Sequence, residues 1–575
     1  MSNNTYLELK KALYAKIEKY FVITSFLDFL LSTIEIDENS DYEKSTWAVF
    51  NAYIQGSSSY IMSVFNDLKS EYDNFMPKSS ANRILLRNCV EAILILNVLE
   101  NKPELATPYF ATYYSDKERI KNIYINSDED DEKAENKRFL KRFSWLPRYR
   151  GKKAKSMSDL LNYVNFESEY QKNYYKIIIK NFDTFIHPSF NFARSLNNNL
   201  LGGSIAGVYA MFIDHGIFQE SVTNLLSSFK SIYQNHFKES VFEILDALLD
   251  SGPYNSTPLP IKAEELLDVN FNNENKTAVL SSVYSTFNIN KYYQKITTKS
   301  PSYLESVSSI IGMCANYLTK YTRTSYRIKN IAYLLQDLTP RYDDMLHSVY
   351  ENNPMQFYAQ SRYIIESLSI INVLMLEDEE RSKMYAIHQR IKGYDAKISA
   401  VDFINSSNEE IKAGTTNTAI NEQYFKDIDI IHNYYLKDFD KDVDEKNILR
   451  LNGWALYLKY KNNDTVPNSP FFVAWLCECF YQQNYEEVSS LLLGLFEESN
   501  AFTHVTPYGF NHNKESFNLE KPLLLINDLS ARLIYSLFKN FEVEKLLNEE
   551  EKKNVQNGFF NALEAIKKQI SNTNG

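Results

Sequence analysis

The sequence predicts an all-α fold made of two related helical bundles. The chain has 575 residues but only 15 glycines and 15 prolines, the two residue types that interrupt helices. Apolar residues make up 44% of the chain and recur at helical spacing over long segments, so amphipathic helices can fill large cores. A chain of this length exceeds one ordinary core, and we therefore expect at least two domains.

The predicted elements follow one another with few interruptions. Helical spacing covers residues 6–35, 44–76, 81–99, 157–186, 204–214 and 216–250 of the first half. Segment 126–136 is polar and acidic without apolar periodicity, which predicts an exposed loop. Three prolines in 251–265 predict a linker between a first domain at 1–250 and a second at 266–570. The second domain carries a polar insertion near 403–422.

One helical unit is found twice, which indicates an internal duplication. Residues 87–99 and 362–374 both fit R-x3-E-x5-N-V-L without a gap. A tryptophan and then an aromatic-x-His triplet follow in each half, as Trp145 and Phe185-Ile186-His187 in the first and Trp454 and Phe502-Thr503-His504 in the second. The spacing between these features grows in the second half, as expected when surface loops are lengthened.

The repeated polar residues are the candidate catalytic residues. Arg87 and Glu91 lie one helical turn apart in an apolar helix, and Arg362 and Glu366 repeat the arrangement. Buried charges need partners, so each pair is expected either to neutralise itself or to line a polar pocket. In a pocket, arginine would bind an anion, glutamate would act as acid, base or orienting group, and His187 and His504 would carry protons. The alternative is a satisfied network that sets the helix register.

A basic and aromatic stretch at 137–155 is the candidate nucleic-acid interface. It contains nine cationic residues and no acidic one, in a chain whose net charge is −11. Cations neutralise phosphates and aromatic rings stack on unpaired bases. The candidate contacts are Lys141, Arg142, Trp145, Arg148, Arg150, Lys152 and Lys153. The alternative is a solvated loop whose cations screen the acidic run at 128–132.

The order of these motifs resembles a family of uncharacterised bacterial all-helical domains. In the first half the resemblance is carried by Trp145, Gly151-Lys152-Lys153, Met157, Tyr170, Tyr174 and His187-Pro188-Ser189. These domains are similar to the HEPN-type helical proteins of prokaryotic defence and toxin systems. Ribonucleases of that type carry R-x(4–6)-H on one helix, whereas the repeated arginine and histidine of this chain are far apart in sequence. One literal R-x5-H occurs, from Arg341 to His347, without a counterpart in the first half.

The resemblance implies a defence or abortive-infection-type protein that engages RNA or another phosphate ligand, with a HEPN-like ribonuclease as one candidate activity. The alternative function is a non-enzymatic helical scaffold or sensor that binds a protein partner. Neither a metal nor a cofactor is expected, since Cys477-x-Cys479 has no partner pair at zinc-like spacing. No apolar stretch reaches the length of a membrane span, and no signal core opens the chain, so we expect a cytoplasmic location.

Overall fold

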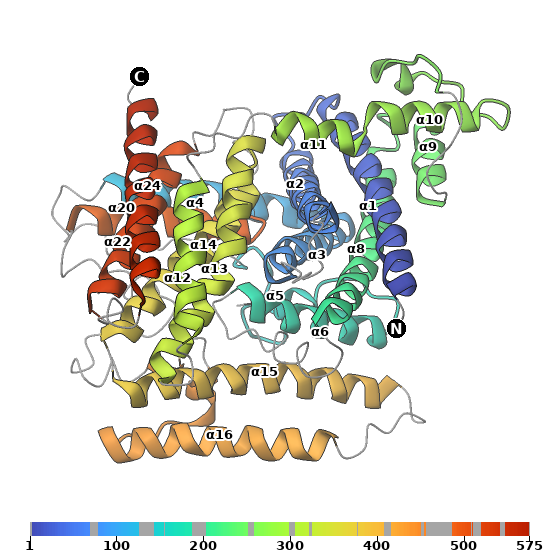
Figure 1. Cartoon of the computed structure of the whole chain (residues 1–575). Helices are drawn as coiled ribbons and strands as arrows, with labels where there is room; N and C mark the ends of the chain where they lie inside the picture. The colour runs from blue at the N-terminus through green and yellow to red at the C-terminus, as the bar shows by residue number, and fades with distance from the viewer. Residues whose placement is uncertain are drawn as a thin grey trace.

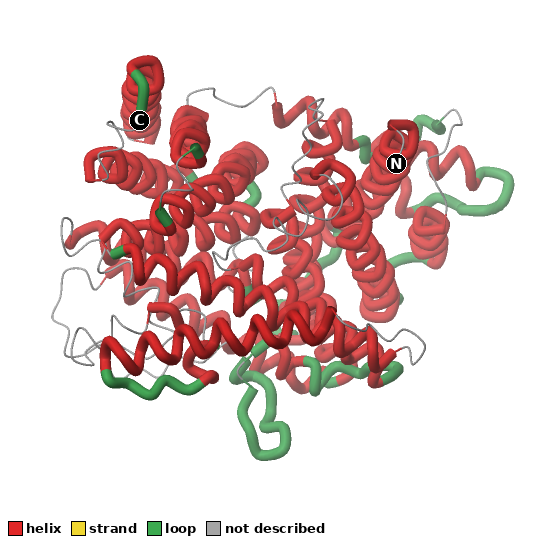
Figure 2. Tube along the Cα trace, turned by 60° about the horizontal axis from the view of Figure 1, so that its bottom comes forward, coloured by secondary structure: helices red, strands yellow, loops and turns green. Residues whose placement is uncertain are grey.

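Long helices form where apolar side chains recur every three to four residues. In α1 (Asn3–Ser32), Leu13, Ile17 and Tyr20 follow this spacing, and all three are buried. The computed structural model describes residues 3–69, 79–125, 143–154, 156–186, 203–250, 258–297, 305–320, 325–376, 378–407, 416–449, 453–455, 486–507, 509, 519–540 and 547–573. Within these ranges the chain forms helices and loops without a strand, which confirms the all-α class (Figure 1; Figure 2).

The first half contains the helices that the sequence predicts, with two differences in where they break and one further helix, at 106–125, that was not predicted. After α1 come α2 (Asp41–Lys69), α3 (Ser79–Asn101), the 3-10 turn η1 (Pro103–Leu105), α4 (Ala106–Ile125), α5 (Met157–Leu160), α6 (Glu169–Ile186), α8 (Gly203–Tyr233) and α9 (Glu239–Asp250). The predicted helix at 157–186 is two helices, because α5 is a single capped turn that begins after Ser156. The predicted break at residue 215 is absent, and the chain turns after Tyr233 instead.

The second half has longer helices. Its elements are η3 (Glu264–Leu267), α10 (Lys276–Thr286), α11 (Ile289–Thr297), α12 (Glu305–Thr319), α13 (Tyr326–Glu351), α14 (Pro354–Leu376), α15 (Glu379–Ser407), α16 (Thr416–Phe439), α17 (Glu445–Ile448), η5 (Gly453–Ala455), α20 (Glu486–Thr503), α22 (Glu520–Asn540) and α24 (Glu549–Thr573). Helices α15 and α16 pack along each other, and residues 408–415 of the predicted insertion between them lie outside the described residues (Figure 1).

Buried side chains from both halves form one continuous hydrophobic core. Asn353, in the turn between α13 and α14, donates to Ser59 Oγ of α2 at 2.6 Å, which fastens this turn to the first half. Cys89 of α3 and Met355 of α14 both approach Gly56 of α2. The boundary near 251–265 stays a prediction, with 251–257 outside the described residues. No helix in the described parts of the chain is long and apolar enough to cross a membrane.

Helix packing is reciprocal between the halves. Helix α3 packs on α2 and α6, and α14 packs on α13 and α20. Helix α4 of the first half lies against α20 of the second, while α15 of the second half lies against α6 of the first (Figure 1). An exchange of equivalent helices between two copies would produce this pattern. The duplication itself stays a prediction that this packing agrees with.

The two repeated tryptophans have matching surroundings. Trp145 packs edge to face on Tyr109 of α4, with ring centroids 5.0 Å apart and an interplanar angle of 70°. Trp454 packs in the same manner on Tyr385 of α15, at 4.8 Å and 73°. Both tryptophans are buried. Trp145 thus packs its segment against α4, and Trp454 packs its segment against α15, the two helices that contact the opposite half.

Candidate functional site

The second half brings together all three of its predicted catalytic residues. Arg362 Nε donates to Glu366 Oε1 at 3.2 Å, one turn further along α14. Arg362 Nη1 lies 2.7 Å from Nε2 of His504, which is 142 residues away in sequence. Arg362 is 7% exposed and Glu366 is 2% exposed, while His504 is half-buried. The site is therefore enclosed on the α14 side and reaches solvent on the side of the imidazole.

The contact between guanidinium and imidazole determines which imidazole nitrogen carries a proton. A guanidinium only donates hydrogen bonds, so Nε2 of His504 must accept. That assigns the proton of a neutral imidazole to Nδ1. In this contact the Nε2 lone pair of His504 points at Arg362.

A helix from the first half holds His504 in place. Helix α20 ends at Thr503, and the next turn places Val505 at φ 48°, a left-handed conformation that valine rarely adopts. The hydroxyl of Tyr109 on α4 donates to the carbonyl oxygen of Val505 at 2.8 Å. Arg119 on α4 pairs with Glu497 on α20 at 3.2 Å. The α4 helix therefore supports the strained turn that carries the imidazole.

Two aromatic rings outside the repeated motifs, those of Tyr358 and Phe496, lie beside residues of the site. Tyr358 stacks on Phe502 with centroids 4.5 Å apart, and the Phe496 ring lies 5.7 Å from Arg362 Cζ. A positional signal existed for both rings. Tyr358 precedes Arg362 by one helical turn, and Phe496 precedes His504 by about two turns.

The first half repeats the arginine–glutamate pair in a more enclosed setting. Arg87 Nη1 donates to Glu91 Oε2 at 2.9 Å, with Arg87 3% exposed and Glu91 fully buried. One turn earlier, Arg83 Nε donates to both carboxylate oxygens of Asp214 on α8, at 3.2 and 2.9 Å. Burial raises the pKa of Asp214, although the guanidinium acts in the opposite direction. The predicted partner His187 lies outside the described residues.

The described part of the basic stretch forms an exposed turn. Arg148, Arg150, Lys152 and Lys153 are exposed, and the turn is closed by hydrogen bonds between the backbones of Tyr149 and Lys152. Gly151, at φ 77°, supplies the left-handed conformation that this turn requires. Lys141 and Arg142 lie outside the described residues.

Trp145 does not have the role expected of it. It is 4% exposed and packed on Tyr109, so its ring cannot stack on a base. This corrects its assignment as a nucleic-acid contact. The ring of Tyr109 packs on Trp145, which precedes the exposed basic turn in sequence, and its hydroxyl donates to the turn after His504. Tyr109 therefore contacts both the basic segment and the second-half site.

The literal R-x5-H of α13 does not present its arginine to a ligand. Arg341 is fully buried, donates to Asp337 at 3.3 Å, and lies over the face of Tyr363. His347 uses Nδ1 to contact the carbonyl oxygen of Asp343 at 2.7 Å. Arg341 is held in a buried network beside Tyr363, the neighbour of Arg362 in sequence, and we therefore interpret the R-x5-H motif as stabilising the fold.

Comparison with known proteins returned no matching family model, no similar curated protein and no similar solved structure. The resemblance to helical defence domains therefore stays a prediction. In the described residues, no group of three or more histidine, cysteine, aspartate or glutamate side chains could hold a metal ion. Cys477 and Cys479 lie outside those residues.

Proposed function

We propose that this chain is a cytoplasmic bacterial defence protein of the abortive-infection type that engages RNA, with Arg362, Glu366 and His504 as a ribonuclease centre. The observation that carries the proposal is the 2.7 Å contact between Arg362 Nη1 and His504 Nε2. A guanidinium and an imidazole are the pair of groups that a metal-independent reaction at a phosphodiester needs. The defence setting rests on the sequence resemblance alone.

The chemistry follows from the state of the imidazole. A phosphate oxygen that pairs with Arg362 would replace His504 as its acceptor and release the Nε2 lone pair. Nε2 then takes the proton of the ribose 2′-hydroxyl as the 2′-oxygen attacks phosphorus. The bond from phosphorus to the 5′-oxygen breaks, and that oxygen takes a proton from the imidazolium or from water. The products are a 2′,3′-cyclic phosphate and a 5′-hydroxyl.

Arg362 and Glu366 have distinct roles in this scheme. The guanidinium stabilises the negative charge that grows on the phosphate oxygens in the transition state. Glu366 holds the guanidinium through Nε, which leaves the Nη atoms directed at His504 and the ligand. The exposed turn with Arg148, Arg150, Lys152 and Lys153 supplies the electrostatic contacts along the RNA backbone.

The test is cleavage and binding of a labelled single-stranded RNA in EDTA. Wild type should produce fragments with cyclic phosphate ends, and His504→Ala should not, while the exposed His236→Ala is the matched control. Replacing the four cations of the turn by alanine should weaken binding at low salt and reduce the salt dependence by roughly 0.7 per lost phosphate contact. Cleavage that survives in His504→Ala would refute the catalytic assignment.

The second candidate is a non-enzymatic scaffold that binds a protein partner. The observation in its favour is that both repeated arginines are buried and neutralised by their own glutamates. If wild type neither binds nor cleaves RNA at low salt, and Arg362→Ala only lowers the melting temperature, the scaffold is the better description.

A further inference from the structure

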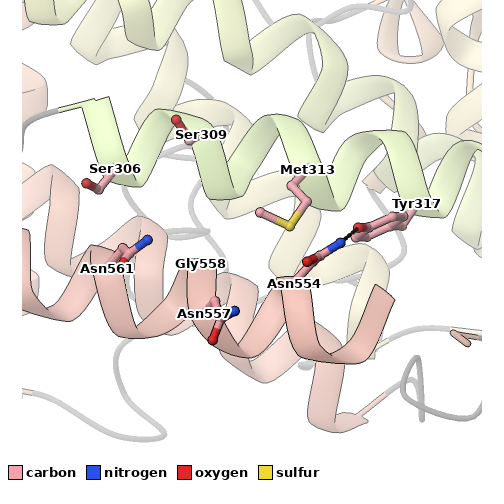
Figure 3. Close-up of a pocket in the computed structure, with 8 residues that line it drawn as sticks. All are labelled: Ser306, Ser309, Met313, Tyr317, Asn554, Asn557, Gly558 and Asn561. Carbon is pink, nitrogen blue, oxygen red and sulfur yellow. Dashed lines mark hydrogen bonds between the residues drawn. The ribbon is translucent and has the colours of Figure 1, made fainter. Parts of the chain in front are cut away.

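A groove of about 500 Å³ runs between α12 and α24, and its lining includes no residue of the Arg362 site (Figure 3). One face of each helix lines it, as Ser306, Ser309, Met313 and Tyr317 from α12 and Asn554, Asn557, Gly558 and Asn561 from α24. Ser306 lies opposite Asn561 and Tyr317 opposite Asn554, so the two helices run antiparallel along the groove (Figure 3). The groove is thus elongated and has polar groups on both walls.

The lining limits the class of ligand. No lining side chain carries a charge at neutral pH, so the groove lacks the cations that phosphate or nucleic acid needs and the carboxylates that a metal ion needs. What it offers instead is amides and hydroxyls. An asparagine amide has one acceptor oxygen and two donor hydrogens, so it can pair with a peptide group through both N–H and C=O.

The amides have the spacing and the freedom for such pairing. Asn557 and Asn561 are one turn apart, roughly 6 Å along the helix axis. An extended polypeptide presents peptide groups on the same side every ~6.7 Å. Both amides are exposed, and neither is hydrogen-bonded to another group in the described chain. Asn554 makes one long contact, from Nδ2 to Tyr317 Oη at 3.5 Å.

A glycine lets α24 pack closely on α12 at the floor of the groove. Gly558 lies inside α24, where glycine costs about 1 kcal/mol relative to alanine. A Cβ at this position would meet Met313 Cε at 3.1 Å and Ile310 at 3.4 Å. Close approach of α24 to α12 thus depends on the missing side chain, and Met313 provides an adaptable apolar base for whatever lies above it.

We propose that this groove binds the main chain of an extended, uncharged polypeptide segment through the amides of Asn557 and Asn561. The segment lies along the groove with small side chains over Met313 and Gly558. This interaction is separate from the RNA site, and the failure of one does not bear on the other.

The experiment uses the full chain and a fluorescent eight-residue peptide of alternating serine and alanine, acetylated and amidated at its ends. We expect saturable binding by anisotropy, with a loss of about ten-fold or more in Asn557→Ala/Asn561→Ala. Gly558→Ala should also weaken binding, because its Cβ narrows the floor. Gln556→Ala, an exposed change on the opposite face of α24, should bind as wild type does.

A second probe separates main-chain recognition from other causes. The same peptide with N-methylated main-chain amides has lost its donors and should not bind. Equal binding of the methylated peptide, equal binding by the double asparagine variant, or absence of saturable binding by wild type would overturn the proposal. Competition by an uncharged oligosaccharide as strong as that by unlabelled peptide would also overturn it and indicate a sugar site.

Discussion

The two R-x3-E helices differ in how far their ion pairs are enclosed. Arg87 and Glu91 are 3% and 0% exposed, whereas Arg362 and Glu366 are 7% and 2% exposed and lie beside the half-buried His504; the equivalent His187 lies outside the described residues. The helix motif therefore determines the ion pair, and helices distant in sequence supply the groups that meet it. In the second half these are α20, which carries the imidazole, and α4, which supports its turn.

The largest difference between the copies should appear when the glutamates are removed. Glu91→Ala leaves the Arg87 charge without its ion-pair partner in the core, and such a loss typically costs about 3–5 kcal/mol. Glu366→Ala should cost less, because Arg362 keeps its contact with His504 near solvent. Urea unfolding of both variants measures the order. Equal losses, or a larger loss in Glu366→Ala, would contradict the comparison.

A double variant of the first pair provides the control. Arg87→Met with Glu91→Leu replaces both charges by apolar groups of similar volume, which is often neutral or stabilising when an ion pair is buried. We expect this variant to unfold close to wild type and to keep any activity on RNA. Loss of activity in a stable double variant would mean that the first pair also acts on the ligand.

His504 should have a smaller effect on stability than the glutamates. His504→Ala removes the acceptor of Arg362 Nη1, and a donor left unsatisfied in this way costs about 1–3 kcal/mol. His504→Gln can restore an acceptor but not a base. It should recover part of the melting temperature without recovering cleavage. Recovery of cleavage by glutamine would show that the imidazole acts only as a structural acceptor.

Tyr109 tests whether the first half positions the second-half site. Tyr109→Phe removes the hydrogen bond to the Val505 carbonyl and keeps the ring packed on Trp145, so the expected loss of stability is about 1 kcal/mol. We also expect slower cleavage with unchanged RNA affinity, because the imidazole is less well placed. Tyr114→Phe, an exposed tyrosine on the same helix, is the control. Reduced RNA affinity at an unchanged rate would contradict a positioning role.

The last prediction concerns the dependence of stability on pH, through Glu351 at the end of α13. Burial and the nearby Asp344 raise the pKa of the Glu351 carboxyl to about 8. The folded chain keeps a proton that the unfolded chain loses above its ordinary pKa of 4.5. Stability should therefore fall as the pH rises from about 4.5 to 8.

Glu351→Gln should make that pH profile flatter and leave the variant more stable than wild type at pH above 8, as read from melting temperatures. An unchanged profile would show that the carboxyl is ionised in the folded chain. Because the turn between α13 and α14 is fastened to α2 through Asn353, a single transition in these melts would also indicate that the two halves unfold together.

Local patterns were sufficient to predict most helices of the first half and the two arginine–glutamate pairs, but not α4. Arg87–Glu91 and Arg362–Glu366 are neighbours on one helix, so their spacing in sequence determines their contact. The approach of His504 to Arg362 followed from the repeated order of motifs, not from geometry. The role of Tyr109 was out of reach, because it depends on α4 crossing to the other half, a tertiary contact that no local pattern encodes.

Two expectations failed or changed for a physical reason. The cations that flank Trp145 in sequence predict a ring that stacks on bases. The ring is instead buried against Tyr109, because a large aromatic side chain is more stable in the core than in solvent. The helix at 157–186 is interrupted: the turn that begins with the capping box of Ser156 and Asp159 ends at Leu160, and α6 begins at Glu169.

The most direct test is the rate at which the purified chain cleaves a labelled single-stranded RNA in EDTA, compared among wild type, Arg87→Met/Glu91→Leu and His504→Ala. We expect that the first-half variant cleaves as wild type does, and that His504→Ala, still folded, loses the activity by at least about 100-fold. A folded His504→Ala that cleaves at the wild-type rate, or a wild type that leaves the RNA intact, would contradict it.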